Sequence, residues 1–321
     1  MNIEEIKAGL GSDWSGYRNI MVSTLFNNDP LITAVNDYLA DTGGKQLRPM
    51  LALLAGGACR GRNRMVLACA AVAEIIHTAT LLHDDVTDNG DLRRGKPTVK
   101  ALFSPAISVL SGDYWLARAL YLLCNECTPQ ILECFTKAVE ELAEGEMIQM
   151  TLAQNLGMTE EIYYEIISKK TSSLFIAATR GAAIAAGGSS EEVETMTRYS
   201  LHLGQAFQIR DDIFDYSPSL NTGKSCGADI KERKITAPLI YALRKAPKGE
   251  AKALMEKIKE QSGDVAKAAL GFVMRYDGVA LAQAELVKRA EMAKEALKPL
   301  AESVEKRNLT EIADYLSLRN R

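Results

Sequence analysis

Apolar positions recur at spacings of three and four along most of the chain, which is the period of an amphipathic helix. The stretch from Met65 to Asp88 follows this period and carries alanines over most of its remaining surface. A helix that is apolar on every side is normally buried among other helices. Proline is absent between Pro129 and Pro218, and proline in a helix interior costs about 3 kcal/mol. This region therefore tolerates long helices.

The same pattern predicts helices along the rest of the chain, whereas the period-2 alternation of strands is hard to find. The further predicted helices cover residues 16–40, 46–58, 107–123, 129–155, 159–186, 190–215, 235–246, 249–261, 264–275, 279–303 and 308–319. Turn signals separate them, but we find neither a low-complexity linker nor a repeat of roughly 20 to 50 residues. The predicted fold class is all-α, with residues 1–321 in a single helical domain.

Composition excludes several classes of protein. The 321 residues are 47% apolar and 25% charged, with a net charge of −3, which argues against disorder and against a general nucleic-acid binder. No uninterrupted apolar run approaches the roughly 18 to 20 residues of a membrane helix. The acidic first residues lack the order of a signal peptide. We therefore expect no transmembrane segment, no nucleic-acid partner and a cytoplasmic location.

The six cysteines are too sparse for a disulfide scaffold, so we expect reduced thiols. Cys124 and Cys127 have the spacing of zinc ligands, but a second pair is missing and only Cys134 follows nearby. Ordinary buried or half-buried thiols are the favoured interpretation.

Two acidic motifs share the spacing D-D-x-x-D, one from Asp84 to Asp88 and one from Asp211 to Asp215. Residues four apart lie on one face of a helix, and each motif follows a strongly apolar helical stretch. Clustered carboxylates raise one another's pKa unless a cation is present. A solvated charged face is the simpler alternative, but it does not explain why both motifs repeat one spacing at the end of apolar helices.

The type of cation follows from the ligands, since all-oxygen sites favour Mg²⁺, Mn²⁺ or Ca²⁺. Neither motif has the twelve-residue loop of an EF-hand, and Mg²⁺ typically combines one or two carboxylates with phosphate oxygens of a substrate. Basic residues accompany both motifs and occur on a glycine turn that is not a Walker A loop, because Gln46 follows its lysine. They are Lys45, Arg48, Arg93, Arg94, Lys96, Lys224, Lys231, Arg233 and Lys234. Together these residues favour a Mg²⁺-bound diphosphate.

The motifs resemble those of the trans-isoprenyl diphosphate synthases, also called polyprenyl synthetases. The resemblance runs from Lys45 to Pro238 in the family's order. Its segments are Gly44-Lys45-Gln46-Leu47-Arg48-Pro49, Leu82-His83-Asp84-Asp85-Val86-Thr87-Asp88, Arg93-Arg94-Gly95, Gly112-Asp113, Lys170-Thr171, Phe207-Gln208-Ile209-Arg210-Asp211-Asp212, and Gly223-Lys224 with Asp229 and Lys234. One departure is Arg233, which stands where the family usually has glycine.

The resemblance implies an antiparallel helical bundle around a deep central cavity, usually as a homodimer. It implies head-to-tail (1′-4) condensation of isopentenyl diphosphate with an allylic diphosphate such as farnesyl diphosphate. The expected cofactor is Mg²⁺, with three ions in the loaded enzyme and Mn²⁺ as a substitute. The expected metal-binding residues are Asp84, Asp85, Asp88, Asp211, Asp212 and Asp215. Of these, Asp85, Asp212 and Asp215 are better suited to orient water or complete the charge.

The resemblance also assigns the substrate sites. The residues expected to act in catalysis are Asp84, Asp85, Asp88, Lys170, Asp211, Asp212 and Lys224. Those expected to bind isopentenyl diphosphate are Lys45, Arg48, His77 and Arg94, although a histidine on a buried helix is more often a hydrogen-bonded core residue. Those expected to bind the allylic diphosphate are Arg93, Lys170, Thr171, Gln208, Lys224 and Lys234.

Product length depends on the residues before the first motif. Ala79 and Thr80 lie five and four positions before Asp84, where short-chain members of the family commonly carry an aromatic ring. A helix of about 24 residues is roughly 36 Å long, which leaves room for many isoprene units. We expect a long-chain product of the octaprenyl type, unless Ala79 serves only close helix packing. A long lipid product also implies contact with a membrane surface at release.

Other functions remain open at this point. These are a short-chain farnesyl or geranylgeranyl synthase, a non-catalytic partner subunit, and a Mg²⁺-binding structural bundle. A class I terpene cyclase is disfavoured because Asp215 and Ser219 do not match its second motif. A di-iron bundle would need two Glu-x-x-His motifs, and only that of Glu74 and His77 is present.

Overall fold

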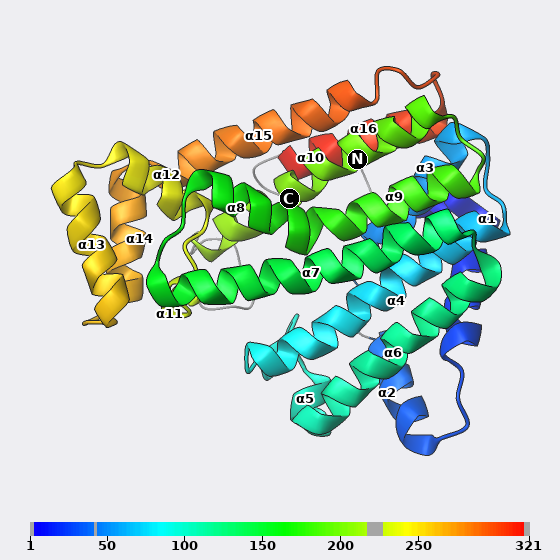
Figure 1. The fold of residues 1–321 in the computed structure, drawn as a ribbon, viewed down its shortest axis with the longest axis horizontal. Coiled ribbons are helices and arrows are strands. Elements are labelled where there is room, and N and C mark those ends of the chain that lie inside the picture. The colour runs from blue at the N-terminus through cyan, green and yellow to red at the C-terminus, as the bar shows by residue number, and fades with distance from the viewer. Residues whose placement is uncertain (1–2, 42–43, 217–226, 318–321) are drawn as a thin grey trace. The chain divides into compact units, whose positions relative to one another are not determined.

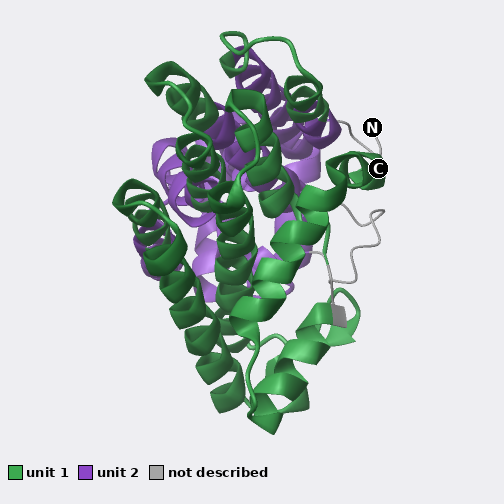
Figure 2. Ribbon diagram, turned by 90° about the vertical axis from the view of Figure 1, so that its right-hand side faces the viewer, with its two compact units in different colours: residues 1–139, 174–198, 296–311 green, residues 140–173, 199–295, 312–321 purple. Residues whose placement is uncertain are grey.

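The structure is a computed structural model that describes residues 3–41, 44–216 and 227–317. It contains two compact units that the chain enters more than once (Figure 2). Unit 1 comprises Met1–Val139, Leu174–Arg198 and Ala296–Glu311, and unit 2 comprises Glu140–Ser173, Tyr199–Glu295 and Ile312–Arg321. The single domain and the central cavity expected from the sequence stay predictions.

Helices account for almost all regular structure in the described residues, so the predicted all-α fold class is confirmed (Figure 1). The helices are α1 (Ile3–Leu25), α2 (Pro30–Asp41), α3 (Leu47–Cys59), α4 (Arg64–Thr87), α5 (Val99–Leu102), α6 (Pro105–Glu126), α7 (Pro129–Asn155), α8 (Glu160–Ile167), α9 (Ser173–Ala185), α10 (Ser190–Asp215), α11 (Ala228–Lys231), α12 (Ala237–Lys245), α13 (Lys248–Glu260), α14 (Val265–Arg275), α15 (Gly278–Ala296) and α16 (Val304–Ser317). A π-helix, η1 (Ser168–Ser172), joins α8 to α9, and β1 (Leu92–Arg93) pairs antiparallel with β2 (Lys96–Pro97).

The core of unit 1 is built around α4, which packs against α1, α3 and α6. Asn63 caps the start of α4, because its side chain accepts a hydrogen bond from Val66 N at 3.0 Å and donates one to Ala185 O at 2.6 Å. Among the described residues, α4 alone is long and apolar enough for a membrane span, yet 61% of its most apolar window is buried in the protein. We therefore assign α4 to the core, as its pattern predicted.

The core of unit 2 lies where α8, the end of α10 and helices α12 to α15 contribute apolar side chains. Its buried members include Tyr163, Ile209, Leu239, Phe272 and Leu286. The second aspartate motif is the end of α10 in this unit, so the motif continues from a packed helix. Its position is therefore fixed by the apolar contacts of Ile209, before the first aspartate, and of Ile213, within the motif.

The helix predicted over residues 16–40 is wrong, because the chain forms two helices there. The first, α1, begins at Ile3, is kinked at Gly11 (φ 49°), and ends at Leu25. Asp29 then caps α2, since its carboxylate accepts hydrogen bonds from Leu31 N at 2.9 Å and Ile32 N at 3.1 Å. Proline at position 30 suits the first turn of a helix and interrupts a continuous one.

Smaller differences have similar causes. The helix expected over 279–303 ends at residue 296, and the last helix begins at residue 304 rather than 308. The stretch predicted as one helix over 159–186 contains η1, and the pattern did not predict the short hairpin of β1 and β2. The π-helical turn of η1 contains one residue more than an α-helical turn. This extra residue leaves the apolar period on either side intact, so periodicity alone does not reveal it.

Candidate active site

The first aspartate motif forms the last turn of α4. Asp84 and Asp88 lie one turn apart, and the Asp88 backbone N–H donates to Asp84 O at 2.8 Å. Asp85 is buried, with 7% exposure, and one of its oxygens accepts from both Nε and Nη2 of Arg93 at 2.9 Å. Burial raises the pKa of Asp85 and the Arg93 guanidinium opposes that rise. The middle carboxylate therefore has a cationic partner, while Asp88 is exposed at the helix end.

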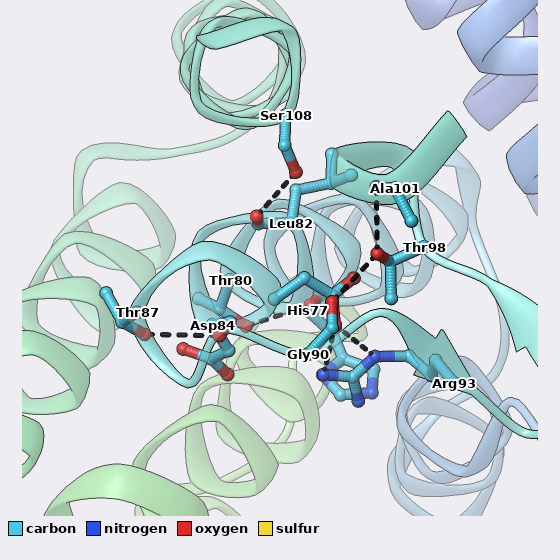
Figure 3. A network of polar contacts seen from close by, with 11 residues as sticks. His77, Thr80, Leu82, Asp84, Thr87, Gly90, Arg93, Thr98, Ala101 and Ser108 are labelled. Carbon is cyan, nitrogen blue, oxygen red and sulfur yellow. Dashed lines mark hydrogen bonds and ion pairs between the residues drawn. The ribbon is translucent and has the colours of Figure 1, made fainter. Parts of the chain in front are cut away.

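A folded loop brings Arg93 to this position. Gly90 N donates to Asp85 O at 3.0 Å, and the Thr98 hydroxyl donates to Gly90 O at 2.9 Å. Arg94 and Gly95 both have positive φ in the turn between β1 and β2. Figure 3 shows Arg93 pointing back toward the end of α4. The two arginines that the sequence selected thus have different roles, because Arg93 is held in an ion pair and Arg94 is exposed in the turn.

A cluster of basic residues in unit 1 surrounds α4, one to three turns before the first motif. The Arg48 guanidinium stacks over the Phe175 ring at 4.7 Å, and its Nε is buried without a hydrogen-bond partner among the described residues. Burial lowers the pKa of Arg48 to about 10. Burial also lowers the pKa of His77 well below its usual range, and the charges of Arg48 and Arg94 add to that effect. His77 is consequently neutral at pH 7.

The loop before α3 is close to the same cluster. A Cβ on Gly44 would lie 2.4 Å from Nη1 of Arg94, so a larger residue at position 44 would displace the Arg94 guanidinium. Lys45 follows and is exposed. The structure therefore brings Arg48, His77 and Arg94 together and places Lys45 next to the glycine that contacts Arg94.

Glu74 is a member of this cluster that the sequence analysis did not assign. It lies one turn before His77 on α4, and burial raises its pKa while Arg48, Arg94 and Lys7 oppose the rise. The available signal was a carboxylate within an otherwise apolar helix, which is rarely buried unless it is paired.

The second motif ends α10 in unit 2, and its middle carboxylate is supported differently. Asp212 is 4% exposed and accepts hydrogen bonds from Tyr163 Oη at 2.5 Å, Gln208 Nε2 at 2.9 Å and Ala237 N at 3.4 Å. Burial raises the pKa of Asp212 to about 6, although these neutral donors oppose the rise. Asp211, by contrast, is exposed.

Asp215, the last residue of that motif, caps a short helix. Its carboxylate accepts from Ala228 N at 3.0 Å and Asp229 N at 3.2 Å, and its carbonyl accepts from Gly227 N at 2.9 Å. Asp229 is itself a buried carboxyl whose pKa is raised to about 8, first by burial and then by Asp212 and Asp215. Asp229 belonged to the sequence pattern but had no assigned role. In the structure it forms an acidic group of unit 2 with Asp212 and Asp215.

The π-helix η1 presents Lys170 and Thr171. Lys170 Nζ contacts Gln149 Oε1 at 2.6 Å and Glu146 Oε1 at 2.9 Å, both from α7. The Thr171 hydroxyl donates to Gln208 Oε1 at 2.7 Å, so Gln208 connects Thr171 to Asp212. π-Helical turns are frequent at functional sites. The sequence analysis selected Lys170, Thr171 and Gln208, but it missed Glu146 and Gln149.

Two glycines allow the neighbouring helices to approach η1. A Cβ on Gly145 would lie 2.9 Å from Lys170 N, and a Cβ on Gly204 would lie 2.6 Å from Ser172 Cα. Each distance is shorter than side-chain carbons tolerate against backbone. Glycine at both positions is therefore required for Lys170 to take its place.

The loop that carries Lys234 explains the departure noted in the sequence. Arg233 has φ of 59°, in the left-handed region that favours glycine, so this arginine adopts the backbone expected of the family's usual residue. Lys234 N donates to Asp229 O at 2.7 Å, and Lys234 Nζ pairs with Glu232 at 2.7 Å. Lys224 and Ser219 lie outside the described residues.

The two motifs supply carboxylate oxygens, which suit a hard divalent cation. In the described parts of the chain, no group of three or more His, Cys, Asp or Glu side chains could hold a metal ion by itself. Mg²⁺ typically takes only one or two carboxylates and completes its shell with water and phosphate oxygens, so each motif can supply such ligands from its own unit. Asp85 and Asp212 are already held by protein donors.

Known proteins share both the sequence and the fold. A sequence model described as Polyprenyl synthetase matches residues 29–272. Octaprenyl diphosphate synthase of Escherichia coli (strain K12) is 38% identical over 264 residues, covering 82% of each chain, and all-trans-nonaprenyl-diphosphate synthase (geranyl-diphosphate specific) of Rhodobacter capsulatus is 36% identical, covering 97% of each. The crystal structure of a polyprenyl synthase from Caulobacter crescentus CB15, complexed with calcium and isoprenyl diphosphate, has a TM-score of 0.92 and 32% identity, and covers 100% of this chain and 98% of that one.

An all-helical chain with two such carboxylate motifs and a basic cluster beside the first is a metal-dependent prenyltransferase. The match over residues 29–272 and these identities show that the chain belongs to the polyprenyl synthetase family.

Proposed function

We propose that this enzyme condenses isopentenyl diphosphate with an allylic diphosphate, head to tail, to make a long-chain all-trans polyprenyl diphosphate. The observation that carries the proposal is that each of two identically spaced aspartate motifs ends a buried helix and has cationic side chains in its own unit. Arg48 and Arg94 accompany the first motif, and Lys170 accompanies the second. The octaprenyl and nonaprenyl relatives support the choice of product class.

The cluster in unit 1 suits the diphosphate of the non-allylic substrate. Arg48 holds a desolvated guanidinium whose Nε has no described partner, and a charged donor of this kind gains most from an anionic acceptor. His77 is neutral and acts as a hydrogen-bonding group. We assign isopentenyl diphosphate to Lys45, Arg48, His77 and Arg94, with Glu74 balancing the charge of the arginines.

Residues around η1 suit the allylic diphosphate. Lys170 is positioned by Gln149 and Glu146, so its ammonium reaches the anion without a large loss of side-chain freedom. Thr171 and Gln208 form a hydrogen-bonded pair beside it. Arg93, Lys224 and Lys234 complete the proposed set, each as a cation toward the leaving group.

The carboxylates divide into two roles. Asp84, Asp88 and Asp211 would hold Mg²⁺, whereas Asp85, Asp212 and Asp215 keep their protein partners and orient water or balance charge. Magnesium, when bound, supplies positive charge to the diphosphate that leaves the allylic carbon. We expect three ions in the loaded enzyme, with Mn²⁺ as a substitute.

The reaction does not require a protein base. As the allylic C–O bond breaks, the developing carbocation is attacked by the double bond of isopentenyl diphosphate, and the released diphosphate takes the proton that restores a double bond. Such a cation requires apolar surroundings that exclude water.

Product length is assigned to Ala79 and Thr80. Neither side chain is bulky. Ala79 is buried, and the Thr80 hydroxyl donates to the His77 carbonyl at 2.8 Å. We predict that Ala79→Phe shifts the products to shorter chains, as resolved by reversed-phase chromatography after dephosphorylation. Val66→Phe, farther from the motif on α4, is the matched control. We expect it to leave the distribution of product lengths as in the parent protein. An unchanged product distribution in Ala79→Phe would remove this assignment.

We further propose a cytoplasmic homodimer that contacts a membrane surface only to release its product. Large apolar side chains on α6 are exposed, among them Leu110 at 66% and Tyr121 at 61%, and such exposure marks interaction surfaces. Sedimentation should give twice the chain mass, and Leu110→Glu should shift the protein toward monomer. A monomeric parent protein would exclude the dimer.

The experiment for the function is incubation of purified protein with radiolabelled isopentenyl diphosphate and farnesyl diphosphate, with Mg²⁺ or with EDTA. Long-chain, Mg²⁺-dependent product supports the proposal. Short products indicate a farnesyl or geranylgeranyl synthase, and absence of any elongation indicates a non-catalytic subunit.

A further inference from the structure

The last turns of α4 are bound to α6 by a set of contacts that the proposed reaction does not use. Ser108 of α6 is fully buried, and its hydroxyl donates to Leu82 O at 2.7 Å (Figure 3). The next residue along α4, His83, has its Nε2 3.3 Å from Val109 O and 3.2 Å from Asp113 Oδ1. Because both partners are oxygen acceptors, Nε2 carries the hydrogen and donates it to them. Two consecutive residues of α4 are thus bound to α6.

Gly112 provides the space in which the His83 ring lies. A Cβ at position 112 would lie 2.3 Å from Nε2 and 2.6 Å from Cδ2 of His83. An alanine here would therefore displace the imidazole from its acceptors. The pair Gly112-Asp113 belonged to the sequence pattern without a role, and this contact gives it one, since the glycine admits the ring and the aspartate binds it.

The contact with α6 and the ion pair with Arg93 support α4 on two different sides. Successive residues of an α-helix are about 100° apart, so the side chains of His83 and Asp85 leave the helix roughly 200° apart. Asp84 lies between them, and Asp88 shares its face because it follows four residues later. His83 is held by α6 on one flank of this face, and Asp85 is held by Arg93 at 2.9 Å on the other. The face that carries Asp84 and Asp88 is therefore fixed from both flanks.

This end of α4 needs such support. The last carbonyls of a helix lack intrahelical partners, and carboxylates one turn apart repel each other until a cation binds. Both effects favour fraying of the turn that carries the motif. Contacts from a packed neighbouring helix oppose the fraying, so the carboxylates keep their direction before the cation arrives.

We propose that His83 is a positioning residue for the divalent cation, because its anchor beside Gly112 of α6 fixes the direction in which Asp84 and Asp88 leave α4. This inference rests on the proposed function, since it takes these two carboxylates as ligands of the Mg²⁺ that binds with diphosphate. His83 is assigned no contact with the ion or with substrate. Residues that orient metal ligands typically contribute about 10- to 100-fold to metal affinity. Loss of the anchor should therefore weaken metal binding and leave the isopentenyl diphosphate cluster unchanged.

The test compares Gly112→Ala, His83→Ala and the double variant of the full-length protein. Mn²⁺ binding in the presence of inorganic diphosphate is followed by electron paramagnetic resonance. Each single variant should raise the Mn²⁺ dissociation constant by about tenfold. The double variant should show the same rise rather than about a hundredfold, because alanine at position 112 displaces nothing once the imidazole is gone. Gly9→Ala is the matched control and should stay within about twofold of the parent protein, since its position is exposed and no atom lies near its Cβ.

Two further measurements separate positioning from a general loss of stability. Backbone hydrogen exchange in the peptide that covers residues 82–90 should become at least about tenfold faster in both single variants, while the midpoint of urea unfolding stays close to that of the parent protein. In the elongation assay, the Mg²⁺ concentration at half-maximal turnover should rise about tenfold. The KM for isopentenyl diphosphate should stay within about twofold, because uniform binding of that substrate is not altered.

Three results would overturn the inference. They are parental Mn²⁺ affinity in His83→Ala, additive losses in the double variant, and a lowered urea midpoint without faster exchange at the end of α4. If Gly112→Ala does not fold, Asp113→Ala replaces it, because the Asp113 side chain is 63% exposed and binds the same ring. A parent protein that binds Mn²⁺ with diphosphate but does not elongate rejects the proposed function alone, and the Mn²⁺ and exchange measurements still decide the role of His83.

Discussion

The two aspartate motifs have the same spacing but are stabilised in different ways. In unit 1 the middle carboxylate, Asp85, pairs with the charged guanidinium of Arg93. In unit 2 the middle carboxylate, Asp212, is surrounded by the neutral donors Tyr163, Gln208 and Ala237 N. The shared spacing therefore determines which carboxylates end a helix. The surrounding fold determines whether the negative charge of the middle carboxylate is balanced by a cation or by neutral hydrogen-bond donors.

The third carboxylates differ in the same sense. Asp88 is exposed at the end of α4, whereas Asp215 accepts backbone hydrogen bonds from the residues that begin α11. The second motif thus organises its own loop, and the first depends on a hairpin that folds back on it. We expect the motifs to be equally important for turnover and unequal in their response to changes in their supports.

The largest effect is expected from the outer carboxylates. Asp84→Asn and Asp211→Asn should each lower kcat by at least about 10²-fold, because each removes a charge that holds the cation against the leaving group. Labelled-substrate assays at saturating Mg²⁺ measure this. Asp277→Asn, an exposed carboxylate paired with Lys245 at 2.6 Å, is the matched control and should keep parental turnover. Full turnover in either motif variant would exclude the proposed metal site.

An intermediate effect is expected from Tyr163→Phe, which acts on the second motif alone. It removes the shortest hydrogen bond to Asp212, so unfolding in urea should become easier by about 1–3 kcal/mol and turnover should fall roughly tenfold. Tyr164→Phe is the control, because that hydroxyl contacts Tyr241 at 2.9 Å and no aspartate of the motif. If Tyr163→Phe and Tyr164→Phe lost turnover equally, the hydrogen bond from Tyr163 to Asp212 would have no specific role in turnover.

The smallest effect concerns pH and belongs to unit 1. The pKa of His77 is lowered in the folded protein, so the unfolded chain takes up a proton first as pH falls. The stability that neutral His77 contributes is therefore present above the unfolded pKa of about 6.5 and is lost below it, with a slope of at most about 1.4 kcal/mol per pH unit. Urea unfolding between pH 5 and 7.5 should show this slope reduced in His77→Gln. An identical slope in both proteins would contradict the assignment.

The sequence contained enough to locate both motifs and the buried helix α4, because those signals are local. It also selected Arg48, His77 and Arg94, which the fold brings together from separate helices and a turn. It did not indicate the support of Asp212 by Tyr163, since the two residues are 49 positions apart and neither sequence environment specifies the other. Half-buried Glu146 and buried Gln149 of α7 were missed for the same reason, because their contacts with Lys170 join residues more than twenty positions apart.

The break between α1 and α2 was missed although Asn27-Asn28-Asp29-Pro30 contains turn-forming residues. Apolar residues on both sides continue a helical period, and periodicity outweighed the local turn signal. The sequence marked Arg233 as a departure because glycine is usual at that position, but it did not predict the left-handed backbone of this residue. In each case, the missing information was a contact or a backbone angle that the side-chain pattern does not encode.

The five-residue turn of η1 has a consequence for the rotational phase of the helices it joins. An α-helix advances by about 100° per residue, so one extra residue rotates everything that follows by that amount. Within unit 2, Lys170 engages Gln149 of α7 and Thr171 engages Gln208 of α10. Deleting one residue between positions 168 and 172 would restore an uninterrupted α-helix, yet it would turn these side chains away from their partners. The insertion is what allows two adjacent residues of one turn to meet two different helices.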